Sequence, residues 1–272
     1  MFFRTLLLLC LTLPAHALEV GGRLAQGGFI LGTAQAGSTV TVNGKKATMA
    51  PDGTFVFGLE RHFPTSAVVV EIPKAGKKLA QEVVIEPREW VVEKVIITNT
   101  KAKQTINPNT KQTNRAAEEQ KAIDEARRTL TYAPHFLGCC QYPLRKADHK
   151  WRISGVFGSS RQFNGQERSW HKGLDLAVPT GTPVYPVASG TVVFAADTFF
   201  SGNLVLIDHG LGILSAYAHL NKMHVKVGQK LNTDNSLGQV GQTGRASGPH
   251  LHWAMYWRQT PIDPILWVEE GT

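Results

Sequence analysis

The feature that most constrains the fold is a run near the C-terminus in which two histidines alternate with apolar residues. Residues 250–257 read His-Leu-His-Trp-Ala-Met-Tyr-Trp and follow a Gly-Pro turn signal. This aromatic and apolar composition is typical of a β-strand. Side chains alternate between the two faces of a strand, so we expect His250 and His252 on one face, with Leu251 and Trp253 in a core. Two imidazoles fixed side by side on a rigid strand suit a metal ion.

A second pair of possible metal ligands lies further upstream. His171 and Asp175 are four residues apart, and Gly173 with the following Leu-Asp-Leu-Ala-Val-Pro favours an extended chain, in which both side chains share a face. A catalytic zinc usually keeps three nitrogen or oxygen ligands from the protein and one open position. His171, Asp175 and one of His250 and His252 would complete such a set. The spacing does not decide which, and the other histidine would remain for proton transfer.

A further histidine, His219, ends a strand-like run that begins near residue 212. It is a candidate second base or transition-state donor, although the residue taken alone is better explained as a structural histidine. The other histidines carry less information. His209 in a turn and His224 in a loop indicate structural or surface positions, and His135 and His149 have no partner at a telling spacing.

A series of short motifs extends from residue 152 to residue 264, over a little under half of the chain. In chain order they are Phe-Gly-Ser-Ser-Arg (157–161), His-Lys-Gly-Leu-Asp (171–175), Gly-Thr-Pro-Val-Tyr (181–185), Ala-Ser-Gly-Thr-Val-Val (188–193), Gly-Asn-Leu-Val-Leu-Ile (202–207), Ala-Tyr-Ala-His-Leu (216–220), Val-Gly-Gln (227–229), Gly-Gln-Thr-Gly-Arg (241–245) and Gly-Pro-His-Leu-His (248–252). The series resembles the lysostaphin-type (LytM-like) zinc metallopeptidases of bacterial cell walls.

The resemblance implies a function and assigns roles to the histidines. It implies that His171, Asp175 and His252 bind one Zn²⁺, and that His219 and His250 assist catalysis. The implied reaction is endopeptidase cleavage of the peptide stems or cross-links of peptidoglycan. Some relatives of this fold have lost their zinc ligands and act as non-catalytic, peptidoglycan-binding activators of other wall hydrolases. Every matched ligand is present here, which favours an enzyme.

Charge and length limit the partners and the architecture. The chain has 272 residues and a formal net charge of +8, so an anionic partner is expected. We find no nucleic-acid recognition motif, and peptidoglycan fits the zinc-site interpretation better. A chain of this length allows one large or two modest domains, each with a core. The oligomeric state is not determined by these features.

The N-terminus has the pattern of a secretory signal peptide. Arg4 precedes an apolar run over residues 5–13, and an Ala-His-Ala cleavage signal ends at residue 17. The run is too short to span a bilayer. Cys10 lacks the small preceding residue expected of a lipid-modified cysteine. We therefore expect residues 1–17 to be removed, with the mature chain exported to the periplasm or cell envelope and not stably inserted in a membrane.

The remaining patterns predict a mainly β protein with a helical connection. Residues 18–95 show short strands and turn signals, typical of a small β-sandwich of immunoglobulin-like type that is wall-binding, autoinhibitory or an inert spacer. Residues 96–144 indicate a linker with a helix over 115–128. This helix is either a solvated connector or a helix that docks near the catalytic cleft and regulates access to it. Residues 145–272 predict an antiparallel β peptidase domain.

Two details of the connecting and catalytic regions stay open in the sequence. Cys139 and Cys140 are adjacent, and a disulfide between neighbours would be strained, so an intermolecular bridge is also possible in an oxidising compartment. Arg161 is expected in the loop that leads into the peptidase domain, where it would either anchor that loop or contact substrate.

Overall fold

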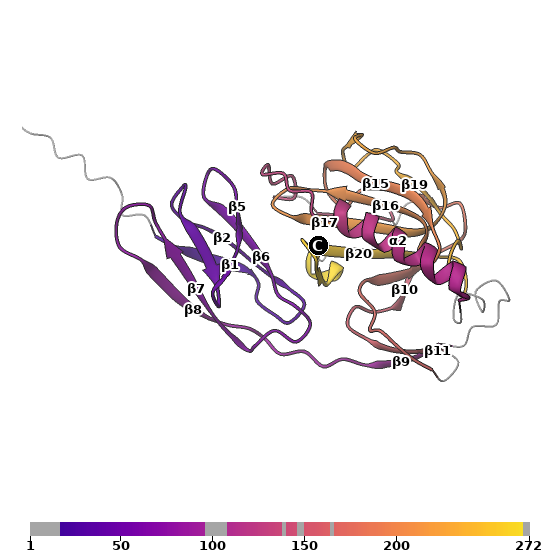
Figure 1. The fold of residues 1–272 in the computed structure, drawn as a ribbon, viewed down its shortest axis with the longest axis horizontal. Coiled ribbons are helices and arrows are strands. Elements are labelled where there is room, and N and C mark those ends of the chain that lie inside the picture. The colour runs from indigo at the N-terminus through magenta and orange to yellow at the C-terminus, as the bar shows by residue number, and fades with distance from the viewer. Residues whose placement is uncertain (1–16, 96–107, 138–139, 146–149, 164–165, 269–272) are drawn as a thin grey trace, which may run out of the picture.

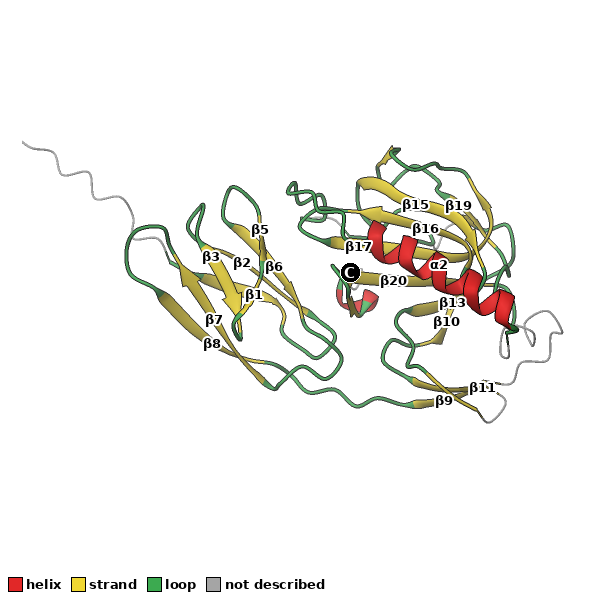
Figure 2. Cartoon of the chain, in the orientation of Figure 1, coloured by secondary structure: helices red, strands yellow, loops and turns green. Residues whose placement is uncertain are grey.

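The computed structural model describes residues 17–95, 108–137, 140–145, 150–163 and 166–268, and the side chains of 93–95 and 161–168 are not described. The expected signal peptide, Cys139 and His149 thus fall outside it, apart from residue 17. The described chain is mainly β (Figures 1 and 2), as the sequence predicted. No helix in these ranges is long and apolar enough to cross a membrane.

The N-terminal part forms two four-stranded antiparallel sheets that face each other as a sandwich (Figure 1). One sheet has the order β1-β2-β6-β5, with bounds Glu19–Arg23, Phe29–Thr33, Thr54–Gly58 and Thr48–Met49. The other has the order β4-β3-β7-β8, with bounds Lys45–Lys46, Thr39–Val42, Ser66–Ile72 and Leu79–Val84. Asn43 and Gly44 both have positive φ between β3 and β4, as the Asn-Gly hairpin signal requires.

The C-terminal part is built around a ten-stranded sheet. Its main order is β10-β13-β20-β17-β16-β15-β18, with bounds Arg152–Gly155, Leu174–Ala177, His250–Trp257, Ile213–Met223, Gly202–Asp208, Gly190–Thr198 and Lys230–Leu231. Three further strands pair at its margins, β14 (Pro183–Val184), β19 (Gly238–Val240) and β21 (Thr260–Ile262), and the 3-10 helix η1 (Pro264–Leu266) follows. The central strands β17 and β20 are almost wholly buried, so both faces of the sheet are covered.

A small three-stranded sheet pairs one strand that follows the sandwich with two strands of the C-terminal part. Its order is β12-β11-β9, with bounds Gln166–Arg168, Ser160–Phe163 and Val92–Val95. β9 pairs in parallel with β11. β9 thus lies within the range expected for the sandwich, yet its partner belongs to the C-terminal part. The division of the chain at residues 95 and 144 stays a prediction.

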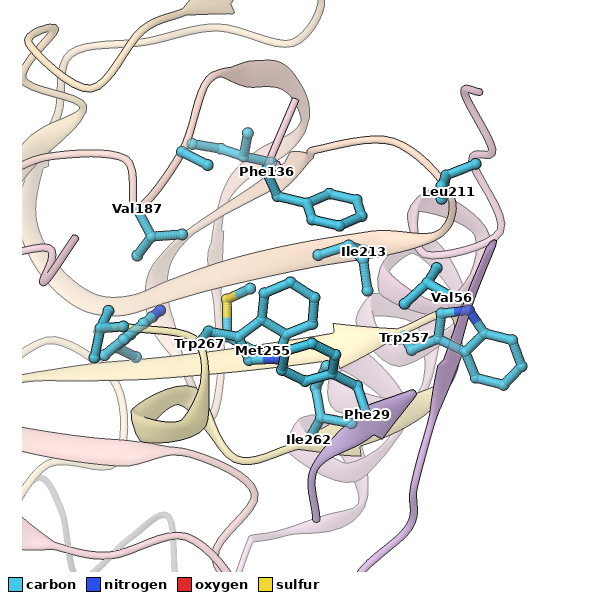
Figure 3. Close-up of a cluster of buried hydrophobic side chains, with 14 of the residues drawn as sticks. Phe29, Val56, Phe136, Val187, Leu211, Ile213, Met255, Trp257, Ile262 and Trp267 are labelled. Atoms are coloured by element: carbon cyan, nitrogen blue, oxygen red, sulfur yellow. The ribbon is translucent and has the colours of Figure 1, made fainter. Parts of the chain in front are cut away.

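One face of the large sheet continues into the core of the sandwich (Figure 3). The rings of Phe29 and Trp267 stack at 4.0 Å between centroids, and those of Phe57 and Trp257 lie 4.5 Å apart. A Cβ atom at Gly58 would lie 2.7 Å from the Cβ of Trp257, so only glycine allows this approach. The two parts therefore share one continuous apolar cluster, whereas the sequence predicted a separate core for each.

The opposite face of the large sheet is covered by α2 (Thr110–Ala126) (Figure 1). Ile123 packs against Leu214, Ala254 and Tyr256, among others. The side chain of Glu119 accepts a hydrogen bond from the backbone N–H of Phe199 at 2.7 Å. The helix is therefore docked on the sheet, and the interpretation as a solvated connector is wrong.

The helix also begins earlier than the expected residue 115. Asn109 caps it, because its side chain accepts from the backbone N–H of Gln112 while the Gln112 side chain accepts from the backbone N–H of Asn109. Such a capping box satisfies two backbone donors that would otherwise lack partners. The polar, Thr- and Asn-rich composition of this segment concealed the helix start, because the same residues are typical of linkers.

A buried polar network supports the hairpin of β16 and β17. His209 is fully buried, with Nδ1 2.7 Å from the carbonyl oxygen of Ser189 and Nε2 2.7 Å from the hydroxyl of Ser215. The Ser215 hydroxyl lies 2.9 Å from that of Tyr217, which accepts from the backbone N–H of Val187. Burial lowers the pKa of His209 to about 4, so the imidazole is neutral at neutral pH. His209 is thus a structural histidine.

This pKa predicts a pH-dependent stability. Below about pH 6.5 the unfolded chain protonates His209 but the folded chain does not, so stability falls with pH until about pH 4. The expected slope from this group approaches roughly 1.4 kcal/mol per pH unit. Urea unfolding of wild type and His209→Gln at pH 7, 6 and 5 should show the shallower dependence in the variant. Equal slopes in the two proteins would contradict the assignment.

Candidate metal site

The strand register between β13 and β20 brings a carboxylate against an imidazole. Asp175 and His252 are direct partners in this antiparallel pair, so their side chains project from the same face of the sheet. His252 Nδ1 lies 2.8 Å from Asp175 Oδ1. The neighbouring pairs, Leu174 with Trp253 and Leu176 with Leu251, face the shared apolar core.

His171 reaches the same point from the segment just before β13. Its backbone N–H donates to Ser159 and its carbonyl oxygen accepts from Gly158, which holds the residue in extended chain. Its ring Nδ1 lies 3.0 Å from the carbonyl oxygen of Val156. A carbonyl only accepts, so Nδ1 carries the proton and Nε2 of the neutral ring has a lone pair for a metal.

Three donor atoms from these residues form a compact triangle. His171 Nε2 lies 3.0 Å from both Asp175 Oδ1 and His252 Nδ1, and the third side measures 2.8 Å. Ligands bound at about 2.0–2.1 Å to a tetrahedral zinc lie about 3.3 Å apart, so the triangle needs to open by only a few tenths of an ångström. Two imidazole nitrogens and one carboxylate oxygen are donors that zinc takes. The residues present therefore fit the ion.

The protonation of Asp175 agrees with a ligand role. Burial alone would raise the pKa of this carboxyl, but the charges and hydrogen bonds of His171 and then His252 outweigh it and hold the pKa well below its ordinary value. The carboxylate is therefore ionised at neutral pH. Three polar side chains converge here with little solvent, a costly arrangement that a bound cation would offset.

His219 enters the site through a β-bulge. In the pairing of β16 with β17, Val205 faces Tyr217 but Asn203 faces Leu220, so β17 carries one extra residue between them. His219 has φ +61, and its backbone N–H donates to Ser201. With strict alternation along β17, the side chain of His219 would point to the face opposite that of Ala218. The extra residue in the bulge changes this direction, so the His219 side chain points toward the site.

His219 and His250 lie side by side at the margin of the donor triangle. Their ring centroids are 4.8 Å apart, and Nδ1 of each lies 2.8 Å from a carbonyl oxygen, of Thr243 and Gly248 respectively. Nδ1 therefore carries the proton in each neutral ring. His250 Nε2 is 3.9 Å from Asp175 Oδ1, so His250 lies outside the triangle that His252 completes.

Burial keeps His219 neutral. It lowers the pKa of His219 well below the ordinary value, and the neighbouring charges of His250 and His252 lower it further. The neutral ring keeps a lone pair on Nε2, and its lowered pKa makes it a weaker base than an exposed imidazole.

His171, His219 and His252 line a cleft of about 330 Å³. Its lining comprises Gln120, Arg127, Ser169, Trp170, His171, Lys172, Phe200, Ser201, His219, Arg245, His252 and Tyr256. The sequence predicted the histidines and offered docking of the helix near the cleft as one alternative, but it did not indicate that Gln120 of α2 and its C-cap Arg127 line the cleft, because no local motif shows which residues of a docked helix face a site. Arg161 is in β11, opposite Arg168, and the question of its role stays open because its side chain is not described.

The comparisons with known proteins confirm the resemblance seen in the sequence. Residues 169–264 match the profile of Peptidase family M23. A solved structure described as a putative peptidase M23 from Pseudomonas aeruginosa superposes with a TM-score of 0.63 at 25% identity, covering 92% of this chain and 96% of that chain. The mainly β fold is thus shared over almost the whole length, including the N-terminal part.

Curated relatives match over the C-terminal part. Peptidoglycan DD-endopeptidase ShyA of Vibrio cholerae is 41% identical over 126 residues, which are 46% of this chain and 29% of ShyA. ShyB of the same organism, also named a peptidoglycan DD-endopeptidase, is 33% identical over 55% of this chain and 34% of its own length. Cell division protein DipM of Caulobacter vibrioides is 37% identical over 44% of this chain and 21% of its own. The chain therefore spans about a third or less of these relatives.

The loop that holds His171 offers a test of the site geometry. Gly158, in this loop, has φ +82, and a Cβ there would overlap the ring of Trp90. We expect Gly158→Ala to displace the loop and lower zinc affinity roughly ten- to hundredfold, the usual effect of losing support behind a ligand. Zinc competition with a chromogenic chelator measures this.

Gly181→Ala is the matched control for that experiment. Gly181 has φ +93, but no atom lies within 4 Å of a Cβ built there, so the substitution adds the same kind of backbone strain without the overlap. Equal zinc affinities in the two variants would show that the contact with Trp90 does not position His171.

Proposed function

We propose that this chain, which carries a Peptidase family M23 domain, is an exported zinc-dependent endopeptidase that hydrolyses peptide bonds of peptidoglycan stems or cross-links. The observation that carries the proposal is the donor triangle of His171, Asp175 and His252, with His219 in the lining of the same cleft and His250 beside it. The names of ShyA and ShyB, both peptidoglycan DD-endopeptidases, support the substrate class. The positive net charge and the predicted signal peptide support action in the cell envelope.

The chain's own side chains divide the work between metal binding and proton transfer. His171, Asp175 and His252 would hold the ion. Zinc bound to such a set would polarise the scissile carbonyl and would lower the pKa of its bound water to roughly 7. His219 and His250 share two tasks: one imidazole accepts a proton, and the other donates a hydrogen bond to the developing oxyanion or a proton to the leaving amine.

The second candidate is a non-catalytic, peptidoglycan-binding activator of other wall hydrolases. The observation that favours it is the similarity to DipM, which is named as a cell division protein rather than as a hydrolase. The complete set of zinc donors argues for the enzyme, because an activator has no need to keep all of them together. Metal content and turnover separate the two functions.

Removal of the metal tests the enzyme directly. Purified peptidoglycan digested by the protein should release peptide fragments, identified by mass. A chelator should abolish release and added Zn²⁺ should restore it. His252→Ala should lose both zinc and hydrolysis, because it removes one of three donors. Zinc-free protein with full activity, or full zinc occupancy in His252→Ala, would reject the assignment.

His219→Ala separates proton transfer from metal binding. His219 is not part of the donor triangle, so the variant should keep one zinc per chain and lose most of its turnover, about 10²–10⁴-fold. Zinc stoichiometry by atomic absorption and hydrolysis of purified peptidoglycan are the two measurements. Loss of zinc in this variant would move His219 into the ligand set.

A further inference from the structure

Three cationic side chains line the cleft beside the candidate metal site. Arg127, Lys172 and Arg245 line it, and among the described lining residues none carries a carboxylate. Asp175 is not among the residues that line the cleft. It belongs to the donor triangle, where its single negative charge faces His171 and His252. The lining of this cleft therefore carries more cationic than anionic side chains.

Each of these cations lies against an aromatic ring. The guanidinium carbon of Arg127 is 3.9 Å from the centroid of the Tyr256 ring, and that of Arg245 is 4.7 Å from the Phe200 ring. Lys172 Nζ lies 6.0 Å from the Trp170 ring. Stacking on a ring restricts the position of a guanidinium without using its N–H donors.

Arg127 is the most constrained of the three. Its side chain is only 16% exposed, and its Nε is buried with no hydrogen-bond partner in the described part of the chain. Its one ion pair, to Asp124, is long, with 3.5 Å between Nη1 and Oδ1. Asp124 also accepts from Gln120 at 2.8 Å. The guanidinium of Arg127 is thus held at the lining of the cleft with only a long ion pair to an acid, and guanidinium groups bind planar carboxylates.

We infer that Arg127, on the connecting helix and outside the matched family region, binds a free carboxylate of the peptide substrate and so determines specificity. The inference rests on the proposed function. The cleft, at about 330 Å³, is at the small end of ligand sites, so a group held by Arg127 and the bond at the metal site belong to neighbouring parts of one short peptide. Lys172 and Arg245 add to the positive potential.

Binding of a matched pair of ligands tests the inference. N-acetyl-D-alanyl-D-alanine and its C-terminal amide differ only in the carboxylate. Calorimetric titration of the zinc-loaded full chain should give roughly ten- to hundredfold tighter binding of the acid. Arg127→Gln should lose most of this preference, and Arg127→Lys should keep an intermediate part. If zinc rather than Arg127 caused the preference for the acid over the amide, that preference would persist in both variants.

Arg128→Gln is the control, because Arg128 is adjacent but exposed and pairs with Glu125. It should keep the wild-type preference. Equal affinity of wild type for acid and amide, or a preference unchanged in Arg127→Gln, would overturn the inference. Zinc content and melting temperature of each variant exclude a merely structural effect, and Arg127→Lys provides the comparison if Arg127→Gln is unstable. The binding measurement does not depend on turnover. A preference for the carboxylate in a protein that does not hydrolyse peptidoglycan would therefore reject the proposed function and leave the inference about Arg127 standing.

Discussion

The pairing of Asp175 with His252 across β13 and β20 is the constraint on which the site depends. The two residues are opposite each other in an antiparallel register, and a slip by one residue would send every side chain of β20 to the other face. The register is held by the alternate residues, since Leu251 and Trp253 are fully buried in the shared core. The same apolar packing that stabilises the sheet therefore aligns the donors of the candidate metal site.

Support for the site also comes from outside the large sheet. His171 is held by a loop whose Phe157 packs edge-on against Trp90 and Trp170, at 6.0 and 5.3 Å between ring centroids. Arg61, from the loop after β6 of the sandwich, lies 5.1 Å from the Trp90 ring. The N-terminal part thus contacts the elements behind His171, while its wall-binding, autoinhibitory or spacer role stays a prediction. On the opposite side, α2 covers the sheet and lines the cleft.

Local patterns predicted most of the elements that carry the site. Alternation in residues 250–257 predicted a strand with two histidines on one face, and the structure has β20 over His250–Trp257. The Asn-Gly signal predicted the β3–β4 hairpin. The sequence left open whether the helix docks or stays solvated, and it gave no sign that β9 pairs in parallel with β11, because both depend on partners more than sixty residues away in sequence.

Residue types and their spacing determined which side chains could act together: two imidazoles at alternate strand positions, and an imidazole and a carboxylate four residues apart in extended chain. Tertiary structure alone decided how they meet. It placed His252 within the donor triangle and His250 at its margin, and it turned His219 into the site through a bulge with positive φ. Periodicity is set by neighbours along the chain, whereas register, bulges and helix docking are set by packing between segments that are distant in sequence.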